Sequence, residues 1–136
     1  MIKKLVGFLT VLCMAFFIAG CSSTPDVSGT YLRLNSNNEP VGAIVVKSLN
    51  DKTYDCSQFS YHDEKNKMIK IKNVRRVLNV EKKSLEIDNL DDTALFFNKD
   101  YNTITRTARS ISGANKEYTY KKLSDSEMKQ YQHLFE

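Results

Sequence analysis

The chain has 136 residues, of which 41% are hydrophobic and 26% are charged, and its formal net charge is +4. This length fits a single domain, and the apolar content is too high for a chain that is disordered throughout. Five Gly, two Pro and the lack of a repeated period exclude collagen-like, low-complexity and solenoid architectures.

The first twenty residues have the pattern of an export leader. Lys3 and Lys4 precede an uncharged, mostly apolar run over residues 5–19, which ends at Gly20. A spanning helix needs about 20 apolar residues, and this run is shorter. We therefore predict a signal peptide over residues 1–20 and no permanent transmembrane anchor.

The segment Ile18-Ala19-Gly20-Cys21 resembles the lipobox of bacterial lipoproteins. That resemblance implies cleavage before Cys21, a diacylglycerol thioether on its sulfur, and acylation of the new amino group by a chain such as palmitate. Two or three acyl chains hold a protein at a membrane far more firmly than one. An ordinary secretory leader followed by an unrelated cysteine is the alternative.

The residue after the predicted lipidated cysteine indicates which membrane the lipid would enter. Gram-negative lipoproteins with Asp directly after the lipidated Cys tend to stay at the inner membrane, and this chain has Ser22 there. The resemblance therefore implies an outer-membrane lipoprotein that faces the periplasm. In a Gram-positive source it implies the outer face of the single membrane.

Removal of the leader leaves a nearly neutral chain with few thiols. Lys3 and Lys4 are lost with no acidic residue, so 18 basic and 16 acidic residues remain, which is not the charge of a nucleic-acid binder. Cys13 is lost as well and Cys21 carries lipid, so no intrachain disulfide is predicted. For Cys56 we expect burial in a strand, with a bond to another chain as the alternative.

Residues 21–28 are predicted to be the lipidated Cys and a flexible tether, and residues 29–136 to be one domain. Short runs rich in β-branched and aromatic residues alternate there with turn compositions. The predicted strands cover residues 30–34, 41–47, 53–61, 68–72, 74–80, 84–88, 94–98, 103–109 and 117–121. This pattern predicts an all-β fold, a small antiparallel meander barrel or folded sandwich of eight to nine strands.

In the predicted strand over residues 53–61, the apolar side chains change from even-numbered to odd-numbered positions. Tyr54 and Cys56 share one face, whereas Phe59 and Tyr61 share the other. A β-bulge near residues 57–58 is predicted to cause the change.

The end of the chain has the signals of an α-helix. Ser124 and Glu127 fit a capping box, and Leu123 and Met128 fit a hydrophobic staple, so a helix is predicted to begin at Asp125. We expect it to pack on the barrel or to plug one end through an apolar stripe formed by Met128, Tyr131, Leu134 and Phe135.

The domain resembles the small lipocalin-like (calycin) barrels. Gly29 and Tyr31 open the first strand as the Gly-x-Trp motif does in that family, and a meander and one helix follow. The resemblance implies an Arg over the ring of Tyr31, for which Arg106 and Arg109 are the candidates. The chain has no Trp and is short for a lipocalin, so an interior filled by side chains is the alternative to a ligand cavity.

A second similarity concerns the loop over residues 111–116. Ser112-Gly113-Ala114 matches the beginning of the Ser-Gly-x-x-Tyr loop of membrane-bound lysozyme inhibitors, but the next tyrosine, Tyr118, comes two places late. The disulfide of that family cannot form here. The similarity therefore assigns no inhibitory residue in this chain.

Catalytic and metal chemistry are not predicted. His62 lies beside acidic residues in a predicted turn, which favours a solvated side chain over a base for Cys56, and His133 lies near the end of the predicted helix. The spacing of a calcium-binding loop is lacking at Asp88, Asp91 and Asp92. We predict no enzyme activity, no metal, and no cofactor other than covalent lipid on Cys21.

One part of the chain is strongly basic. Residues 65–83 contain eight basic residues and one acid, whereas residues 86–100 contain five acids and one lysine. Lys70 and Lys72 are predicted to share a strand face with Arg75 and Arg76 close behind, as a patch for phosphate head groups, lipopolysaccharide or an acidic protein. A solvated sheet face balanced by the acidic neighbours is the alternative.

The leading functional hypothesis is a membrane-anchored envelope lipoprotein that acts as a non-catalytic binding or interaction module for a protein or an amphiphilic ligand, and not for nucleic acid. An amphiphile would need a cavity lined by Tyr31, Tyr54, Phe59, Phe96 or Phe97. The alternative is an inhibitor or immunity protein that blocks a periplasmic hydrolase such as lysozyme through residues 111–116. A small hydrolase that depends on a histidine is a third hypothesis.

Overall fold

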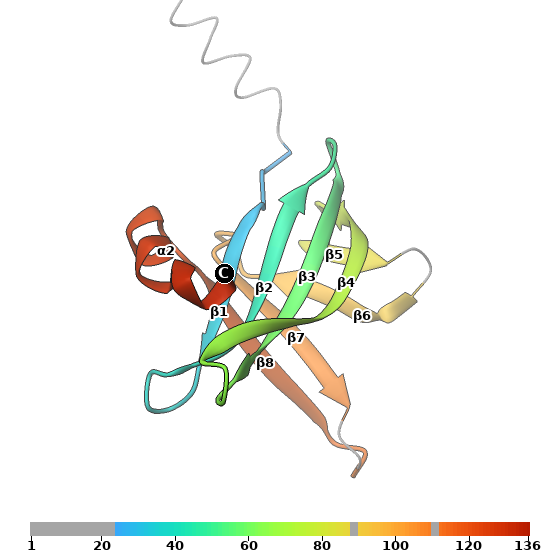
Figure 1. Ribbon diagram of the computed structural model, residues 1–136. Helices are drawn as coiled ribbons and strands as arrows, with labels where there is room; N and C mark the ends of the chain where they lie inside the picture. Colours follow the sequence, from blue (N-terminus) through green and yellow to red (C-terminus); the bar gives the residue numbers. More distant parts are fainter. Residues whose placement is uncertain (1–23, 88–89, 110–111) are drawn as a thin grey trace, which may run out of the picture.

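The computed structural model describes residues 24–87, 90–109 and 112–136 and confirms an all-β barrel with one C-terminal helix (Figure 1). Eight antiparallel strands follow one another around a closed sheet, in which β8 returns to β1. The strands are β1 (Gly29–Leu34), β2 (Pro40–Ser48), β3 (Thr53–His62), β4 (Lys67–Asn79), β5 (Ser84–Ile87), β6 (Leu90–Phe97), β7 (Thr103–Arg109) and β8 (Asn115–Lys122). The predicted leader, Cys21, Asp88 and Ile111 lie outside the described residues.

The two predicted runs over residues 68–72 and 74–80 form the single strand β4. Asn73 lies between them and does not interrupt the strand. Its Nδ2 donates hydrogen bonds to Oδ2 of Asp55 at 3.3 Å and to Oγ of Ser57 at 3.0 Å, both on β3. Because its side chain has these partners on the neighbouring strand, a residue that is common in turns is accommodated within the sheet.

The parity change in β3 arises because this strand packs on both sides of the sheet. Tyr54 and Cys56 belong to the core cluster inside the barrel. Phe59 and Tyr61 pack instead against a second cluster on the outer face of the sheet. Since β3 keeps a regular register with β2 from Tyr54 to Ser60, no bulge in β3 is needed for this change.

A bulge is nevertheless present opposite the predicted position, and it lies in β4. Lys70 pairs with Phe59 and Lys72 pairs with Gln58, so Ile71 is an extra residue between them. The prediction was therefore right about the place in the sheet and wrong about the strand.

One end of the barrel is closed by the segment that precedes β1. Val27 is fully buried in the core cluster, and its carbonyl oxygen accepts a hydrogen bond from the hydroxyl of Tyr31 at 2.8 Å. The hydroxyl of Tyr54 donates to the carbonyl oxygen of Pro25 at 3.4 Å. The expectation of a flexible tether up to residue 28 is therefore wrong for residues 25–28, because burial of Val27 fixes them to the barrel. We call this the closed end.

Towards the opposite end the strands separate into two layers. Among the described residues, β1 pairs with β8 only through Tyr31 and Leu32, and β4 pairs with β5 only through its last three residues. The outer half of the β7–β8 hairpin pairs only within itself, and Figure 1 shows the hairpin projecting from the barrel. We call this the open end; it contains the ends of β1, β3 and β7 and the starts of β2, β4 and β8.

Helix α2 (Asp125–Tyr131) begins at the predicted residue and continues as a 3-10 helix, η1 (Gln132–Phe135). The capping box is formed, with Oγ of Ser124 accepting from the backbone N of Glu127 at 3.3 Å and the Glu127 carboxylate accepting from the backbone N of Ser124 at 3.0 Å. The helical segment packs on the outer face of the barrel and does not plug an end. Beneath it lie Leu32, Ala43 and Met68.

Candidate functional site

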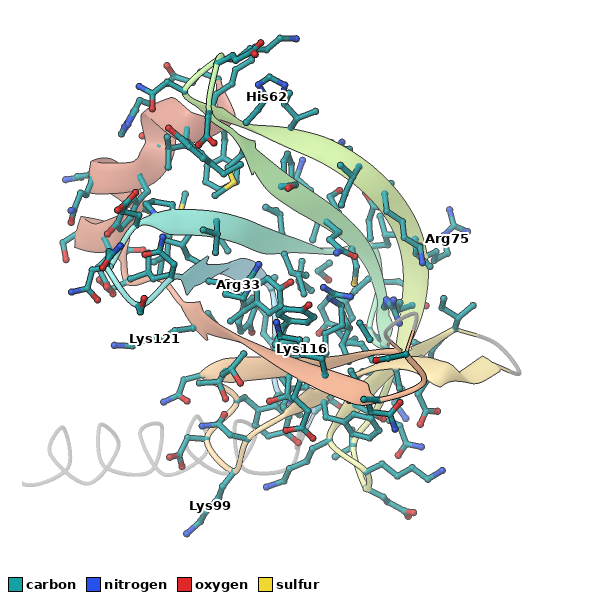
Figure 2. The ribbon with its side chains drawn as sticks, turned by 90° about the horizontal axis from the view of Figure 1, so that it is seen from below. Arg33, His62, Arg75, Lys99, Lys116 and Lys121 are labelled. Carbon is teal, nitrogen blue, oxygen red and sulfur yellow. The ribbon has the colours of Figure 1, made fainter. Side chains whose placement is uncertain are left out.

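Three cationic side chains and one tyrosine point into the open end of the barrel. Each lies an even number of residues from a buried core residue of its own strand, and side chains alternate between the two faces of a strand, so each shares the inward face. Those core residues are Tyr31 on β1, Ile104 on β7 and Tyr120 on β8. Figure 2 shows Arg33 and Lys116 in the space between the two layers of strands. We call Arg33, Arg106, Lys116 and Tyr118 the basic cluster.

The ring of Tyr118 is the common contact of the basic cluster. The Cζ atoms of Arg33 and Arg106 each lie 4.8 Å from its centroid, and Nζ of Lys116 lies 5.5 Å away. Arg106 is paired with Tyr118 across β7 and β8, whereas Arg33 reaches the ring from β1 on the other side of β8. Two guanidinium groups therefore flank one aromatic ring, and each such contact contributes about 0.5–1 kcal/mol at an exposed site.

Among the described residues, most hydrogen-bond donors of the two guanidinium groups have no acceptor. Nε of Arg106 donates to the hydroxyl of Tyr120 at 3.3 Å. Nε of Arg33 is buried and has no acceptor in the described part of the chain. Within the part of the chain that the structure describes, no acidic side chain forms a salt bridge with Arg33, Arg106 or Lys116. The cluster therefore presents positive charge and free donors to whatever enters the open end.

Gly42 on β2 has no side chain, and the side chain of Arg33 lies in the space next to it. The two residues are paired across β1 and β2, and Gly42 is buried. A Cβ atom at this position would lie 3.8 Å from Nε of Arg33, 3.7 Å from the ring of Tyr120 and 3.4 Å from the carbonyl oxygen of Phe59. A side chain longer than that of Ala would therefore displace the Arg33 guanidinium.

The structure separates the four residues that were predicted to form a basic patch. Lys70 and Lys72 lie on opposite faces of β4, because the extra residue Ile71 shifts the register between them. Lys70 and Arg75 are exposed on the outer face, and Figure 2 shows Arg75 pointing away from the barrel. Lys72 and Arg76 face inward and line the same small cavity. The expectation of one continuous basic face is therefore wrong.

Arg76 is part of the barrel interior, since only 6% of its surface is exposed. Its Nη1 donates a hydrogen bond to the carbonyl oxygen of Leu85 at 3.3 Å. Burial lowers the pKa of this guanidinium from its ordinary value. Arg76 is accordingly a buried structural cation and not a surface contact, whereas Lys72 is exposed and adds positive charge to the inward face.

The aromatic residues predicted to line a cavity lie in different surroundings. Tyr31, Tyr54 and Phe97 pack inside the barrel, whereas Phe59 packs on the outer face and Phe96 is 45% exposed. The inner cavity bounded by β2, β3, β4 and β6 has about 10 Å³, which is room for about one water molecule. Side chains therefore fill this part of the barrel, and no acyl chain fits there.

The Arg contact that the lipocalin resemblance implied is not made by Arg106. Tyr31 packs against Phe97, with 6.1 Å between ring centroids, and Arg106 stacks on Tyr118 instead. The side chain of Arg109, the other candidate, lies outside the described part of the structure.

The groups considered for catalysis are not brought together. Cys56 is buried, and its burial raises the pKa of the thiol to about 12. His62 lies at the far end of the same strand, about 20 Å away at the usual rise per residue. His133 lies in η1 on the outside of the barrel. The described residues contain no group of three or more His, Cys, Asp or Glu side chains that could hold a metal ion.

Comparison with protein-family models, with curated proteins and with solved structures gives no match. Among the described residues, no helix has the length and apolar character to cross a membrane.

No pattern in the sequence connects the residues of the basic cluster. Alternation along β1 and β8 puts Arg33 and Lys116 on the core side of their strands, and this alternation can be recognised in the sequence. Their contact with Tyr118 depends on how β8 closes against β1, and two strands so far apart in the chain carry no local signal of their pairing. For Arg106, the lipocalin resemblance implies a contact with Tyr31 and none with Tyr118.

Proposed function

We propose that this protein is a membrane-anchored envelope lipoprotein whose barrel is a non-catalytic binding module with its ligand site at the open end. The observation that carries the proposal is the convergence of Arg33, Arg106 and Lys116 on Tyr118 without an acidic partner among the described residues. Like charges held together lower the stability of a fold, and proteins accept such local costs mainly at functional sites.

A lipid on Cys21 would direct the open end away from the anchoring membrane. Residues 25–28 pack at the closed end, and only Ser22 and Ser23 stand between Cys21 and Thr24. Three residue steps span at most about 11 Å. The closed end would therefore lie near the bilayer, and the basic cluster would face the periplasm if the anchor is in the outer membrane.

The ligand would bind through a polar, negatively charged group. The inner cavity next to Lys72 and Arg76 has only about 10 Å³, which leaves no space for an acyl chain. A protein partner would offer the same kind of group through an acidic side chain, and Lys70 and Arg75 on the outer face remain candidate contacts for such a partner.

Site-specific photo-crosslinking in intact cells tests this proposal. Ser60 is exposed and is paired with Gly42 at the open end. A photoreactive residue at this position should form adducts with the ligand or with the protein that presents the acidic group. The same residue at Asp51, exposed in the β2–β3 turn at the closed end, is the matched control and should form none. The adducts should disappear when Arg33→Gln and Arg106→Gln are combined. Equal adducts from both positions, or adducts that survive the double substitution, would contradict the proposal.

An inhibitor or immunity protein is the second candidate, and the projecting β7–β8 hairpin favours it. In its turn, Gly113 has a φ of +86°, and a Cβ atom there would meet nothing within 4 Å, so this position is free of the barrel. A photoreactive residue at Asn115, exposed beside the turn, would then crosslink to a hydrolase. Adducts from Asn115 together with none from Ser60 would favour this function over a ligand at the open end.

A further inference from the structure

We propose that the basic cluster recognises a phosphate group, which Arg33 and Arg106 contact from the two sides of Tyr118. This inference rests on the proposed function and names the ligand chemistry of the same site. Its starting point is the geometry, in which both guanidinium carbons lie 4.8 Å from the centroid of one ring and are therefore at most twice that distance apart. An anion seated at the edge of the ring lies within reach of both groups.

Hydrogen-bonding capacity supports this assignment. Each guanidinium has five N–H donors in a planar fork that matches the oxygens of a phosphate or carboxylate. Arg106 uses its Nε on Tyr120, and within the described residues the guanidinium of Arg33 donates no hydrogen bond. Both guanidinium groups contact the Tyr118 ring, and within the described residues most of their N–H donors have no protein acceptor. They are therefore preorganised for an oxyanion that arrives from outside.

The amount of charge favours phosphate over a single carboxylate. Arg33, Arg106 and Lys116 bring three positive charges to one ring, and the exposed Lys72 lies on the inward face of β4. A phosphate monoester carries about −1.5 to −2 charges near neutral pH and has three strong acceptor oxygens, whereas a carboxylate carries one charge and two oxygens. The larger charge and the larger number of acceptors match this cluster better.

Phosphate groups could come from a soluble phosphorylated molecule or from a lipid headgroup. Both would meet the cluster through the same oxygens. A headgroup would have to belong to a surface that faces the open end, because the closed end lies next to the site of the predicted anchor.

The test uses the full chain, purified in a neutral detergent, with inorganic phosphate as the probe in isothermal titration calorimetry and with acetate as the monoanionic comparison. Phosphate should bind at least ten times more tightly than acetate, and its affinity should fall as salt rises. A second arm titrates a short-chain phosphatidic acid, against a short-chain phosphatidylcholine, in the same detergent, because a lipidated chain would insert into vesicles of either composition. Phosphatidic acid that binds no more tightly than inorganic phosphate identifies a soluble source, and phosphatidic acid that binds more tightly identifies a headgroup; both support the proposal.

Matched variants localise the binding. Arg33→Gln with Arg106→Gln should weaken phosphate binding at least tenfold. Lys99→Gln with Lys121→Gln removes the same charge from side chains that point away from the cluster in Figure 2, and it should change binding less than twofold. Arg33→Lys with Arg106→Lys keeps the charge and the fold but loses the forks, so its affinity should lie between the two.

Three results would overturn the proposal: no binding of phosphate in either arm, acetate binding as tightly as phosphate, or an equal loss in the Gln variant of the cluster and in its control. Failure of this inference is distinguishable from failure of the proposed function. If phosphate does not bind while the crosslinks from Ser60 still depend on Arg33 and Arg106, the open end is a binding site for another ligand. If these crosslinks are absent as well, both are wrong.

Discussion

The hydroxyl of Tyr31 donates a 2.8 Å hydrogen bond to the carbonyl oxygen of Val27, and both residues are fully buried at the closed end of the barrel. Tyr31→Phe leaves this buried carbonyl without its donor, so we expect the free energy of unfolding to fall by about 1–3 kcal/mol. Urea unfolding followed by circular dichroism measures the change. Tyr131→Phe, at a half-buried tyrosine of the outer cluster, is the control and should stay within about 0.5 kcal/mol of the wild type. Equal losses in the two variants would remove any special role for the bond.

If Cys21 carries the lipid anchor, its sulfur is in a thioether, and Cys56 has the one free thiol of the mature chain. Labelled palmitate fed to cells should enter the wild type and the Cys13→Ser variant but not the Cys21→Ser variant, because only Cys21 occupies the lipobox position. The purified wild type in denaturant should have one reactive thiol per chain, that of Cys56. Label retained after Cys21→Ser, or three thiols in the wild type, would show that the leader is not processed as a lipobox.

Adjacent arginines on β4 should differ sharply in what they contribute to stability. Arg76→Glu puts an unmatched carboxylate among core residues in place of a buried cation that donates to Leu85, and we expect a loss of about 3–5 kcal/mol. Arg75→Glu changes an exposed side chain and should cost less than about 0.5 kcal/mol. Chemical unfolding of the two variants measures the difference. Similar values for both would contradict the placement of Arg76 inside the barrel.

Local patterns in the sequence predicted those parts of the fold that local interactions determine. The capping box at Ser124 lies within one helical turn, and the helix begins where it indicates. The strands follow from short apolar and β-branched runs between turn residues. Asn73 separates two of the predicted runs, because its hydrogen bonds to β3 cannot be seen in the sequence of one strand. The sequence therefore predicts eight to nine antiparallel strands, and the structure has eight.

The site was harder to predict because it depends on register and closure. Lys70 and Lys72 have the same parity in the sequence, and a single extra residue in β4 puts them on opposite faces. Arg33 and Tyr118 meet only because β8 returns to β1, which involves residues almost a whole domain apart in the chain. No local pattern indicates either relationship. The predicted patch therefore failed, while the cluster that the structure brings together was missed.

The buried thiol of Cys56 predicts how stability changes in alkaline solution. Its pKa is raised from an ordinary value of 9.0 to about 12, chiefly because burial disfavours the thiolate. Between these two values the unfolded chain loses this proton while the folded chain keeps it, so the free energy of unfolding decreases as the pH rises. Ionisation of Cys56 has no effect on it well below pH 9. Burial also raises the pKa of Tyr31 and Tyr54 above the ordinary value of 10.0, so their contribution begins at higher pH.

Comparison with a Cys56→Ala variant between pH 9 and pH 10 isolates the contribution of Cys56, because the tyrosines contribute equally to both proteins. Over that unit, the wild type should lose about 1 kcal/mol more unfolding free energy than a Cys56→Ala variant, because one proton is released from the unfolded chain alone. Guanidinium chloride unfolding at pH 8, 9 and 10 measures the two profiles, and their difference at pH 8 gives the loss of packing that the substitution causes. Parallel profiles from pH 8 to pH 10 would mean that the thiol ionises as easily in the folded barrel as in the unfolded chain, and would contradict its burial in the core cluster.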